Sequence, residues 1–170
     1  LVCHASWMSW HFAAFLRWAK HIGKSHKVFG FKDSMLNAAD ILDRHGRFLL
    51  LEHTPHTYLR DVMENYYSAN PDTMLVNVAH RFRDESQYNP QELGYLLAES
   101  QGRAVIRNNK GDYLYAYPRN KKNYIDSKIR EFDAHPNAKF LCINSISNAE
   151  PHDVDKVIAW LERRLGVSTD

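Results

Sequence analysis

Short apolar runs alternate with longer amphipathic segments along this chain, and that alternation constrains its fold more than any other feature. The runs at residues 47–52 (RFLLLE) and 139–144 (KFLCIN) have the length and composition of buried strands. Helices, identified by periodicity and by capping residues, are expected at residues 31–46, 57–70, 71–79, 88–100, 123–135 and 152–166. Helices that alternate with short strands predict an α/β fold.

Two shorter apolar runs near the middle of the chain are predicted to form a hairpin. Residues 104–107 (AVIR) and 113–117 (YLYAY) are separated by NNKGD, a segment rich in turn-forming residues. We therefore expect the two strands to pair with each other.

The first thirty residues are more aromatic than the rest. Histidine and basic residues interrupt the apolar stretch, so it is too polar for a membrane-spanning helix, and it lacks the cleavage pattern of a signal peptide. Trp7, Trp10 and Trp18 recur near the helical period, which predicts an amphipathic helix. A helix packed on the core is favoured over a membrane-surface helix, and contact with a preceding domain is a third possibility. Residues 1–30 are thus expected to form an N-terminal helical segment, distinct from the rest of the chain at residues 31–170.

Composition narrows the functional classes. The chain has 170 residues, of which 44% are hydrophobic and 25% charged, as in one folded domain. A net charge of +2 provides no general field for nucleic acid or an anionic membrane, so an anionic ligand needs a local basic cluster. Cys3 and Cys142 form no disulfide framework, which favours a reducing compartment.

Histidines and arginines gather between residues 51 and 85. His53 and His56 follow the strand at 47–52, and the carboxyl ends of strands are where ligand sites form in open α/β sheets. His80, Arg81 and Arg83 follow the helix expected at 71–79. The segment as a whole is therefore the first candidate for a functional site.

The arginine pair has two explanations. In an extended segment Arg81 and Arg83 point to one face while Phe82 anchors the opposite side. Guanidinium groups bind phosphate through charge-assisted hydrogen bonds and imidazole transfers protons, which are the parts that a phosphoryl-transfer site needs. Alternatively, the arginines pair with carboxylates such as Asp84 or Glu85 at the surface. The spacing alone leaves both explanations open.

A zinc site at His53, His56 and His80 is the metal alternative. Pro55 keeps the first two histidines off a regular helix, and no cysteine or HExxH pattern supports the site. The sequence also lacks a GxSxG motif and a glycine-rich phosphate loop, and Cys142 falls inside an apolar strand. Zinc binding is thus the weaker hypothesis.

Several motifs, taken in order, resemble the third and fourth conserved regions of the stealth family of sugar-phosphate transferases. They are HTPH at 53–56, RDVM at 60–63, a proline at 71, HRFR at 80–83, and a strand that ends in CIN at 142–144 before a last helix. The resemblance covers about residues 30 to 165. It implies transfer of hexose-1-phosphate from a UDP-sugar to an acceptor hydroxyl in capsular or exopolysaccharide synthesis.

The resemblance also implies roles for individual residues. The functional histidine of the family matches His53, with His56 as a close second, and its catalytic arginine matches Arg83. His80 and Arg81 are expected to bind substrate. Asn144, the sixth candidate, matches an asparagine of the family and is expected to contact substrate, although the aspartate that usually follows is Ser145 here.

The first and second conserved regions of the family have no counterpart in this sequence. The chain is therefore expected to be the C-terminal half of a Rossmann-like transferase core that needs an N-terminal half as partner. If Mg²⁺ takes part, its ligands are expected outside this chain. The expected location is the cytoplasm, peripheral to the inner face of the membrane, with a UDP-sugar and a glycan acceptor as further partners. A non-catalytic module that binds glycan or sugar phosphate is the alternative.

Overall fold

The computed structural model describes residues 1–9, 11, 15, 31–44, 47–107, 113–116 and 123–167. These residues fall into two compact units. Unit 1 takes in the described residues of 1–52 and 56–107, and unit 2 those of 53–55 and 113–167. The division near residue 108 was not foreseen from the sequence.

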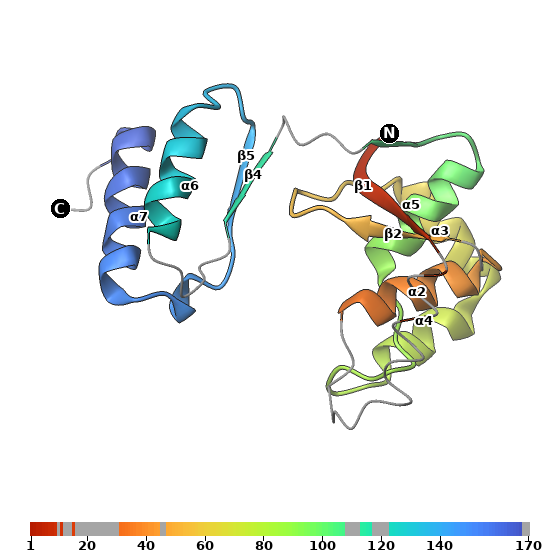
Figure 1. Ribbon diagram of the computed structural model, residues 1–170. Coiled ribbons are helices and arrows are strands. Elements are labelled where there is room, and N and C mark those ends of the chain that lie inside the picture. The colour runs from red at the N-terminus through yellow and green to blue at the C-terminus, as the bar shows by residue number, and fades with distance from the viewer. Residues whose placement is uncertain are drawn as a thin grey trace. The chain divides into compact units, whose positions relative to one another are not determined.

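Unit 1 is built on a three-stranded mixed sheet in the order β2-β1-β3 (Figure 1). The central strand β1, Val2–Ser9, pairs antiparallel with β2, Arg47–Leu51, and parallel with β3, Val105–Arg107. In this register Trp7 lies opposite Leu49 and Cys3 lies opposite Ile106.

The helix predicted for the N-terminal segment is wrong for residues 2–9, which form a strand. Cys3 and Ala5 are buried and alternate with half-buried or exposed neighbours, the two-residue period of a strand. Pairing with β2 and β3 stabilises this conformation, and Trp7 lies under the guanidinium of Arg47, 4.0 Å from its ring centroid. Trp10 and Trp18 lie outside the described residues.

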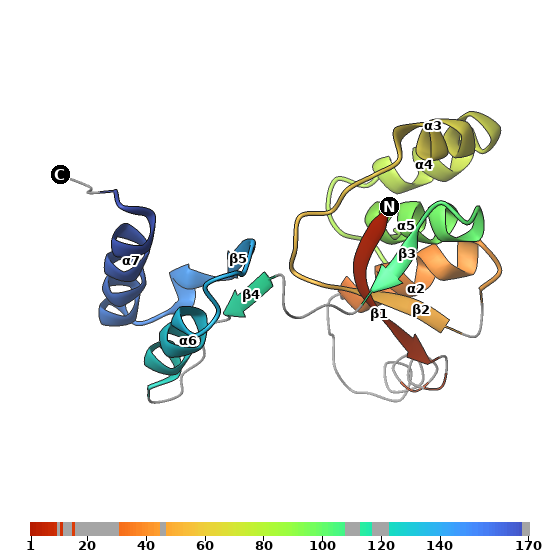
Figure 2. The same ribbon diagram turned by 90° about the horizontal axis from the view of Figure 1, so that it is seen from above.

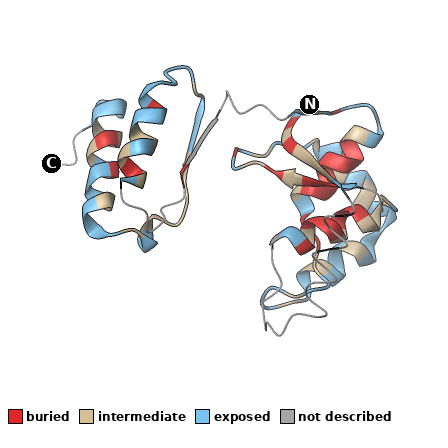
Figure 3. Ribbon diagram, viewed as in Figure 1, coloured by how far each residue is buried: buried red, intermediate tan, exposed pale blue. Residues whose placement is uncertain are grey.

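The helices of unit 1 agree with the expectation from the sequence. They are α2 (Phe31–Ile41), α3 (Arg60–Ala69), α4 (Pro71–Val78) and α5 (Pro90–Ser100). α2 packs on β2, while α5 packs on α2 and α3 (Figure 2). Buried side chains concentrate on α5, where residues 92–98 are all buried (Figure 3). Asn89 caps α5, because its side-chain oxygen accepts hydrogen bonds from the amides of Gln91 and Glu92.

Unit 2 is a small β-α-β-α arrangement. Its elements are β4 (Tyr113–Ala116), α6 (Tyr124–Asp133), β5 (Phe140–Ile143), the short 3₁₀ helix η1 (Ile146–Asn148) and α7 (Pro151–Leu165). β4 and β5 pair in parallel, with α6 as the crossover between them. Ala116, Phe132 and Trp160 form its buried core.

The hairpin predicted for residues 104–117 is therefore wrong. β3 pairs with β1 and β4 pairs with β5, so the two strands belong to different sheets. Both pairings are parallel and join segments that are distant in sequence. The predicted α/β class is confirmed, with six α-helices and five strands among the described residues. None of the described helices combines the length and hydrophobicity that crossing a bilayer requires.

Candidate functional site

His56 lies between β2 and α3 and is held by a buried tyrosine of α5. Its Nδ1 atom is 3.0 Å from the hydroxyl of Tyr95, and the two rings meet edge to face with centroids 5.7 Å apart. Burial raises the pKa of Tyr95 to about 12, so the phenol keeps its proton at neutral pH. The contact with Tyr95 holds the imidazole ring of His56 in place.

The other predicted histidine of this segment is placed differently. His53 is exposed and groups with unit 2, whereas His56 is half-buried and groups with unit 1. The carboxyl-end position after β2 is confirmed for both, because β2 ends at Leu51.

The loop at residues 80–87, which joins α4 to α5, contains a connected set of polar groups. The hydroxyl of Ser86 donates to Oδ1 of Asp84 at 2.7 Å and lies 2.9 Å from Nε2 of His80. Because its one proton is directed to Asp84, the hydroxyl accepts from the Nε2–H of His80. The Ser86 amide also donates to Asp84, and His80 Nδ1 lies 3.9 Å from its other oxygen. The hydrogen bonds from Ser86 and the nearby His80 lower the pKa of Asp84.

The arginines of this loop are both exposed. Arg81 lies over the ring of Phe82, 5.3 Å from its centroid. Arg83 forms no ion pair with any described residue, and neither arginine pairs with Asp84 or Glu85 within the described part of the chain. Exposed guanidinium groups without carboxylate partners remain able to bind an anion.

The expected conformation of this loop is wrong in one respect. The chain bends at Arg81 and Phe82 instead of running extended, and Phe82 does not anchor the segment, since 75% of its side chain is exposed. A phenylalanine so exposed, beside two guanidinium groups, is available to a ligand that presents a ring face.

Within unit 1, His56 does not lie beside Arg81 and Arg83. Figure 1 shows the segment that leads from β2 to α3 and the loop that joins α4 to α5 at different ends of this unit. The last predicted residue, Asn144, belongs to unit 2 and directly follows β5. Its amide donates to the carbonyl of Ala116 at 2.9 Å, and its side-chain oxygen accepts from Ser145. Asn144 is thus half-buried and extends the strand pairing.

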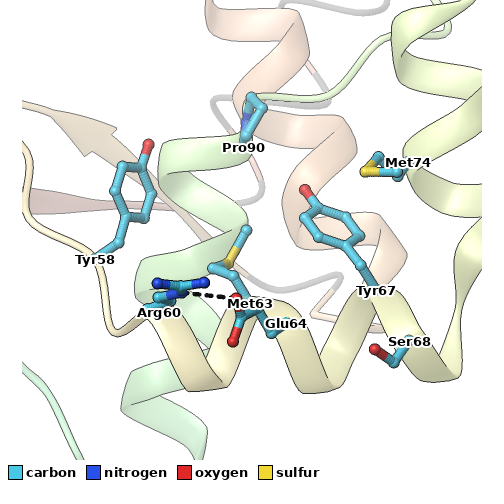
Figure 4. A pocket seen from close by; sticks show the side chains of 8 residues that line it. All are labelled: Tyr58, Arg60, Met63, Glu64, Tyr67, Ser68, Met74 and Pro90. Atoms are coloured by element: carbon cyan, nitrogen blue, oxygen red, sulfur yellow. Dashed lines mark hydrogen bonds and ion pairs between the residues drawn. The ribbon is translucent and has the colours of Figure 1, made fainter.

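An apolar pocket lies between α3, α4 and the start of α5. Its volume is about 650 Å³, and Figure 4 shows its lining: Tyr58, Arg60, Met63, Glu64, Tyr67, Ser68, Met74 and Pro90. The two charged lining residues neutralise each other, with Arg60 Nε donating to Glu64 at 2.7 Å. Burial raises the pKa of Tyr58 to about 12. The pocket therefore offers an apolar, uncharged surface.

Gly94 sets the distance between α3 and α5 at this pocket. A Cβ atom at this position would lie 3.0 Å from both Met63 Sδ and Tyr58 Cδ1. We expect Gly94→Val to lower the free energy of unfolding by about 1 to 3 kcal/mol, the usual cost of overpacking. For Gly94→Ala the better helix propensity, about 1 kcal/mol, opposes the contact with movable side-chain ends, so this variant should be near neutral. Urea denaturation of both variants checks the difference, and equal stability of Gly94→Val and the parent would contradict it.

Metal-ligating groups do not cluster. Among the described residues no group of three or more histidine, cysteine, aspartate or glutamate side chains is placed to hold a metal ion. His56 and His80 belong to the separate segments just described, so this geometry gives no support to the zinc site. The Mg²⁺ ligands are expected outside this chain, and this geometry does not test them.

Sequence reasoning missed the residues that fix the histidines. Tyr95 is 39 residues from His56, and nothing local in the sequence connects them. Ser86 is closer, six residues after His80, and its position two residues from Asp84 is typical of a turn in which a carboxylate accepts from the backbone. The spacing of Asp84 and Ser86 is therefore a local feature from which this turn can be predicted.

A scan against models of known protein families and a search of curated proteins gave no match for this chain.

Proposed function

We propose that this chain forms part of a sugar-1-phosphate transferase and that the loop at residues 80–87 binds the diphosphate of the UDP-sugar. The observation that carries the proposal is Arg83, an exposed guanidinium without an ion pair among the described residues. A guanidinium forks onto phosphate oxygens, and in phosphoryl transfer such neutralisation is a main contribution of the protein.

The surroundings of Arg83 support a phosphate-bearing sugar as ligand. His80 donates its Nε2–H to Ser86 and has its Nδ1 atom 3.9 Å from Asp84, so the imidazole is held by two polar groups of the same loop. The exposed ring of Phe82 is suited to packing against a sugar or a base. The acceptor hydroxyl would attack the β-phosphorus in line while UMP leaves, and Arg83 would stabilise the charge on the transferred group.

The proposal also includes the expectations from the sequence that concern the missing half of the core, Mg²⁺, the other site residues and the location. The parallel β4-α6-β5 unit is of the type that builds Rossmann-like cores, and we propose that this chain contributes to such a core together with an N-terminal half. That half would supply any Mg²⁺ ligands. His53 and His56 would serve in proton transfer, and Asn144 in substrate contact. We further propose a cytoplasmic site of action at the inner face of the membrane.

A non-catalytic module that binds a sugar phosphate is the second candidate. One observation favours it. Tyr95 holds the ring of His56 in a segment apart from the arginines, so within unit 1 the histidine that would transfer a proton does not lie beside the arginines that would bind phosphate. Both candidates require binding at the loop of residues 80–87, and only the transferase requires turnover.

Arg83→Lys is expected to weaken UDP-glucose binding about 10-fold or more, because lysine keeps the charge and loses the two-pronged geometry. The free energy of unfolding should change by less than about 1 kcal/mol, since the side chain is exposed. Calorimetric titration and thermal unfolding of the same sample measure the two effects. Arg81→Lys is the matched control, and it should be closer to neutral because Arg81 already lies on Phe82.

Two outcomes separate the possibilities. Absence of UDP-glucose binding by the parent chain, or equal binding by Arg83→Lys, would refute a diphosphate site on this loop. Binding without transfer of radiolabelled sugar phosphate, even after addition of a matching N-terminal half, would favour the binding module.

A further inference from the structure

α4 has its polar and apolar faces reversed. Asn77 points into unit 1, where its side chain accepts from the amide of Tyr88 at 2.9 Å and its backbone carbonyl accepts from Gln87 at 2.8 Å. Thr73, one turn earlier, is half-buried. The apolar residues face outward, and the exposed fractions are 43% for Met74, 56% for Leu75, 53% for Val76 and 66% for Val78. No residue of α4 is buried (Figure 3). A surface helix normally shows the opposite arrangement.

Two further apolar features adjoin α4: Phe82 in the loop that follows the helix, and the pocket between α3, α4 and α5. Phe82 follows four residues after Val78 and is 75% exposed. Met74 also lines the apolar pocket, where Figure 4 shows it near Tyr67. Met74 and Val78 are four residues apart and Leu75 and Val78 three apart, so these exposed side chains are neighbours on the helix surface. Neighbouring exposed apolar side chains mark an interaction surface, whereas scattered single ones are common. We call residues 74, 75, 76, 78 and 82 the α4 patch.

The charges at the two ends of the α4 patch are opposite. Asp72 lies in the first turn of α4 and is exposed, whereas Arg81 lies just beyond the last turn and is exposed. A two-fold axis across the middle of α4 would place two copies of the helix antiparallel, with each Asp72 near the Arg81 of the partner subunit. The same two-fold rotation places the dipoles of the two helices antiparallel, which is electrostatically favourable. The patch is thus complementary to itself in charge as well as in polarity.

We propose that two copies of this chain associate through the α4 patch, with the α4 helices antiparallel across a two-fold axis and Asp72 paired with Arg81 of the partner subunit. A second copy fits this surface better than an anionic membrane does, because Asp72, the charged residue of α4 itself, would repel the headgroups but can pair with Arg81 of the partner subunit. The inference does not rest on the proposed function. It shares Arg81 and Phe82 with the proposed binding loop, whereas Arg83 and His80 take no part in the contact.

The dimer is expected to be weak. A single short helix with one neighbouring loop covers less than the roughly 800 Å² per partner of a standard interface. Sedimentation velocity up to protein concentrations on the order of 100 µM should therefore show a concentration-dependent monomer–dimer equilibrium. Leu75→Glu and Val78→Glu should each weaken the association at least about 10-fold, since a carboxylate would be buried in the contact.

A charge exchange tests the antiparallel geometry. Asp72→Arg alone and Arg81→Asp alone should each weaken the dimer, and the double variant Asp72→Arg, Arg81→Asp should restore it, because both pairs re-form with reversed sign. Ile158→Glu, at an apolar position of α7 that is 44% exposed, is the matched control and should leave the dimer intact. Circular dichroism must stay unchanged in all variants.

Several results would overturn the proposal. A chain that stays monomeric over the whole concentration range has no such dimer. A dimer that survives Leu75→Glu uses another surface, and failure of the double exchange to restore association excludes the antiparallel pairing. Binding of the monomer to vesicles that contain phosphatidylserine, if Leu75→Glu abolishes it, would assign the patch to a lipid surface instead.

Discussion

Glu92→Gln is expected to remove most of the pH dependence of the stability of unit 1 between pH 4.5 and 9. The Glu92 side chain is fully buried in the first turn of α5, and one carboxyl oxygen accepts from the amide of Leu49 in β2 at 2.6 Å. The other oxygen is also buried and has no hydrogen-bond partner among the described residues. Burial raises the pKa of this carboxyl from 4.5 to about 9, so Glu92 is uncharged at neutral pH.

The direction of the effect follows from proton binding. Above pH 4.5 the unfolded chain releases this proton, while the folded chain keeps it until the pH approaches 9. The free energy of unfolding is therefore highest below pH 4.5 and falls as the pH rises to 9, by an amount on the order of 5 kcal/mol. Glutamine keeps the acceptor for Leu49 and never ionises, so the variant should be more stable than the parent near pH 9.

Urea denaturation across this pH range measures the effect as a difference between parent and variant, which cancels the contribution of other titrating groups. Glu85→Gln is the matched control, because Glu85 is an exposed carboxylate of the same unit. An identical pH dependence in the parent and in Glu92→Gln would show that Glu92 does not remain protonated in the folded state.

The helices could be predicted from the sequence because their signals are local. Asn89 caps α5, Pro71 and Pro151 occupy first turns, and Gly166 ends α7 in the left-handed region with φ 65°. Each of these residues acts on the amides and carbonyls within one turn of itself. Capping and periodicity are therefore sufficient to find such helices.

The strand pairing could not be predicted in the same way. β1 was predicted as a helix because the spacing of the tryptophans outweighed the alternation of Cys3 and Ala5 with more exposed residues. β3 and β4 were predicted to pair because they are neighbours in sequence, whereas each pairs with a distant strand. Strand partners depend on the tertiary fold, and a short apolar run carries little information about its partner.

For the candidate site, too, local features could be predicted from the sequence and long-range contacts could not. The types and positions of His56, His80 and Arg83 were visible in the sequence, but their partners were not. Tyr95 fixes His56 across 39 residues, and the separation of His56 from the arginines is a property of the fold. Likewise, residues 71–79 predicted a helix without indicating which face points inward. The hydrogen bonds of Asn77 to Gln87 and Tyr88 decide that orientation.

Trp160→Ala is expected to unfold unit 2 while unit 1 remains folded. The Trp160 side chain is 3% exposed, packs on Phe132 with ring centroids 5.5 Å apart, and donates its Nε1–H to Asp133 at 2.8 Å. Among the described residues this buried cluster contains, besides the two rings, the small side chain of Ala116, with Ile129, Ala138 and Leu161 partly buried against it, so loss of the indole leaves a cavity that these neighbours fill only in part. Removing a buried tryptophan costs about 3 to 5 kcal/mol, which is comparable with the whole stability of a small unit.

Hydrogen exchange measured by mass spectrometry separates the two units in this variant. Amides of α6 and α7 should lose their protection, while those of α5 should keep it, because the buried clusters around α5 contain no residue of unit 2. Trp160→Phe is the matched control: it keeps a ring against Phe132, loses the hydrogen bond to Asp133, and should cost about 1 to 2 kcal/mol with α6 and α7 still protected. If α5 loses protection together with α6 and α7 in Trp160→Ala, the units unfold as one cooperative body and their separate cores do not confer separate stability.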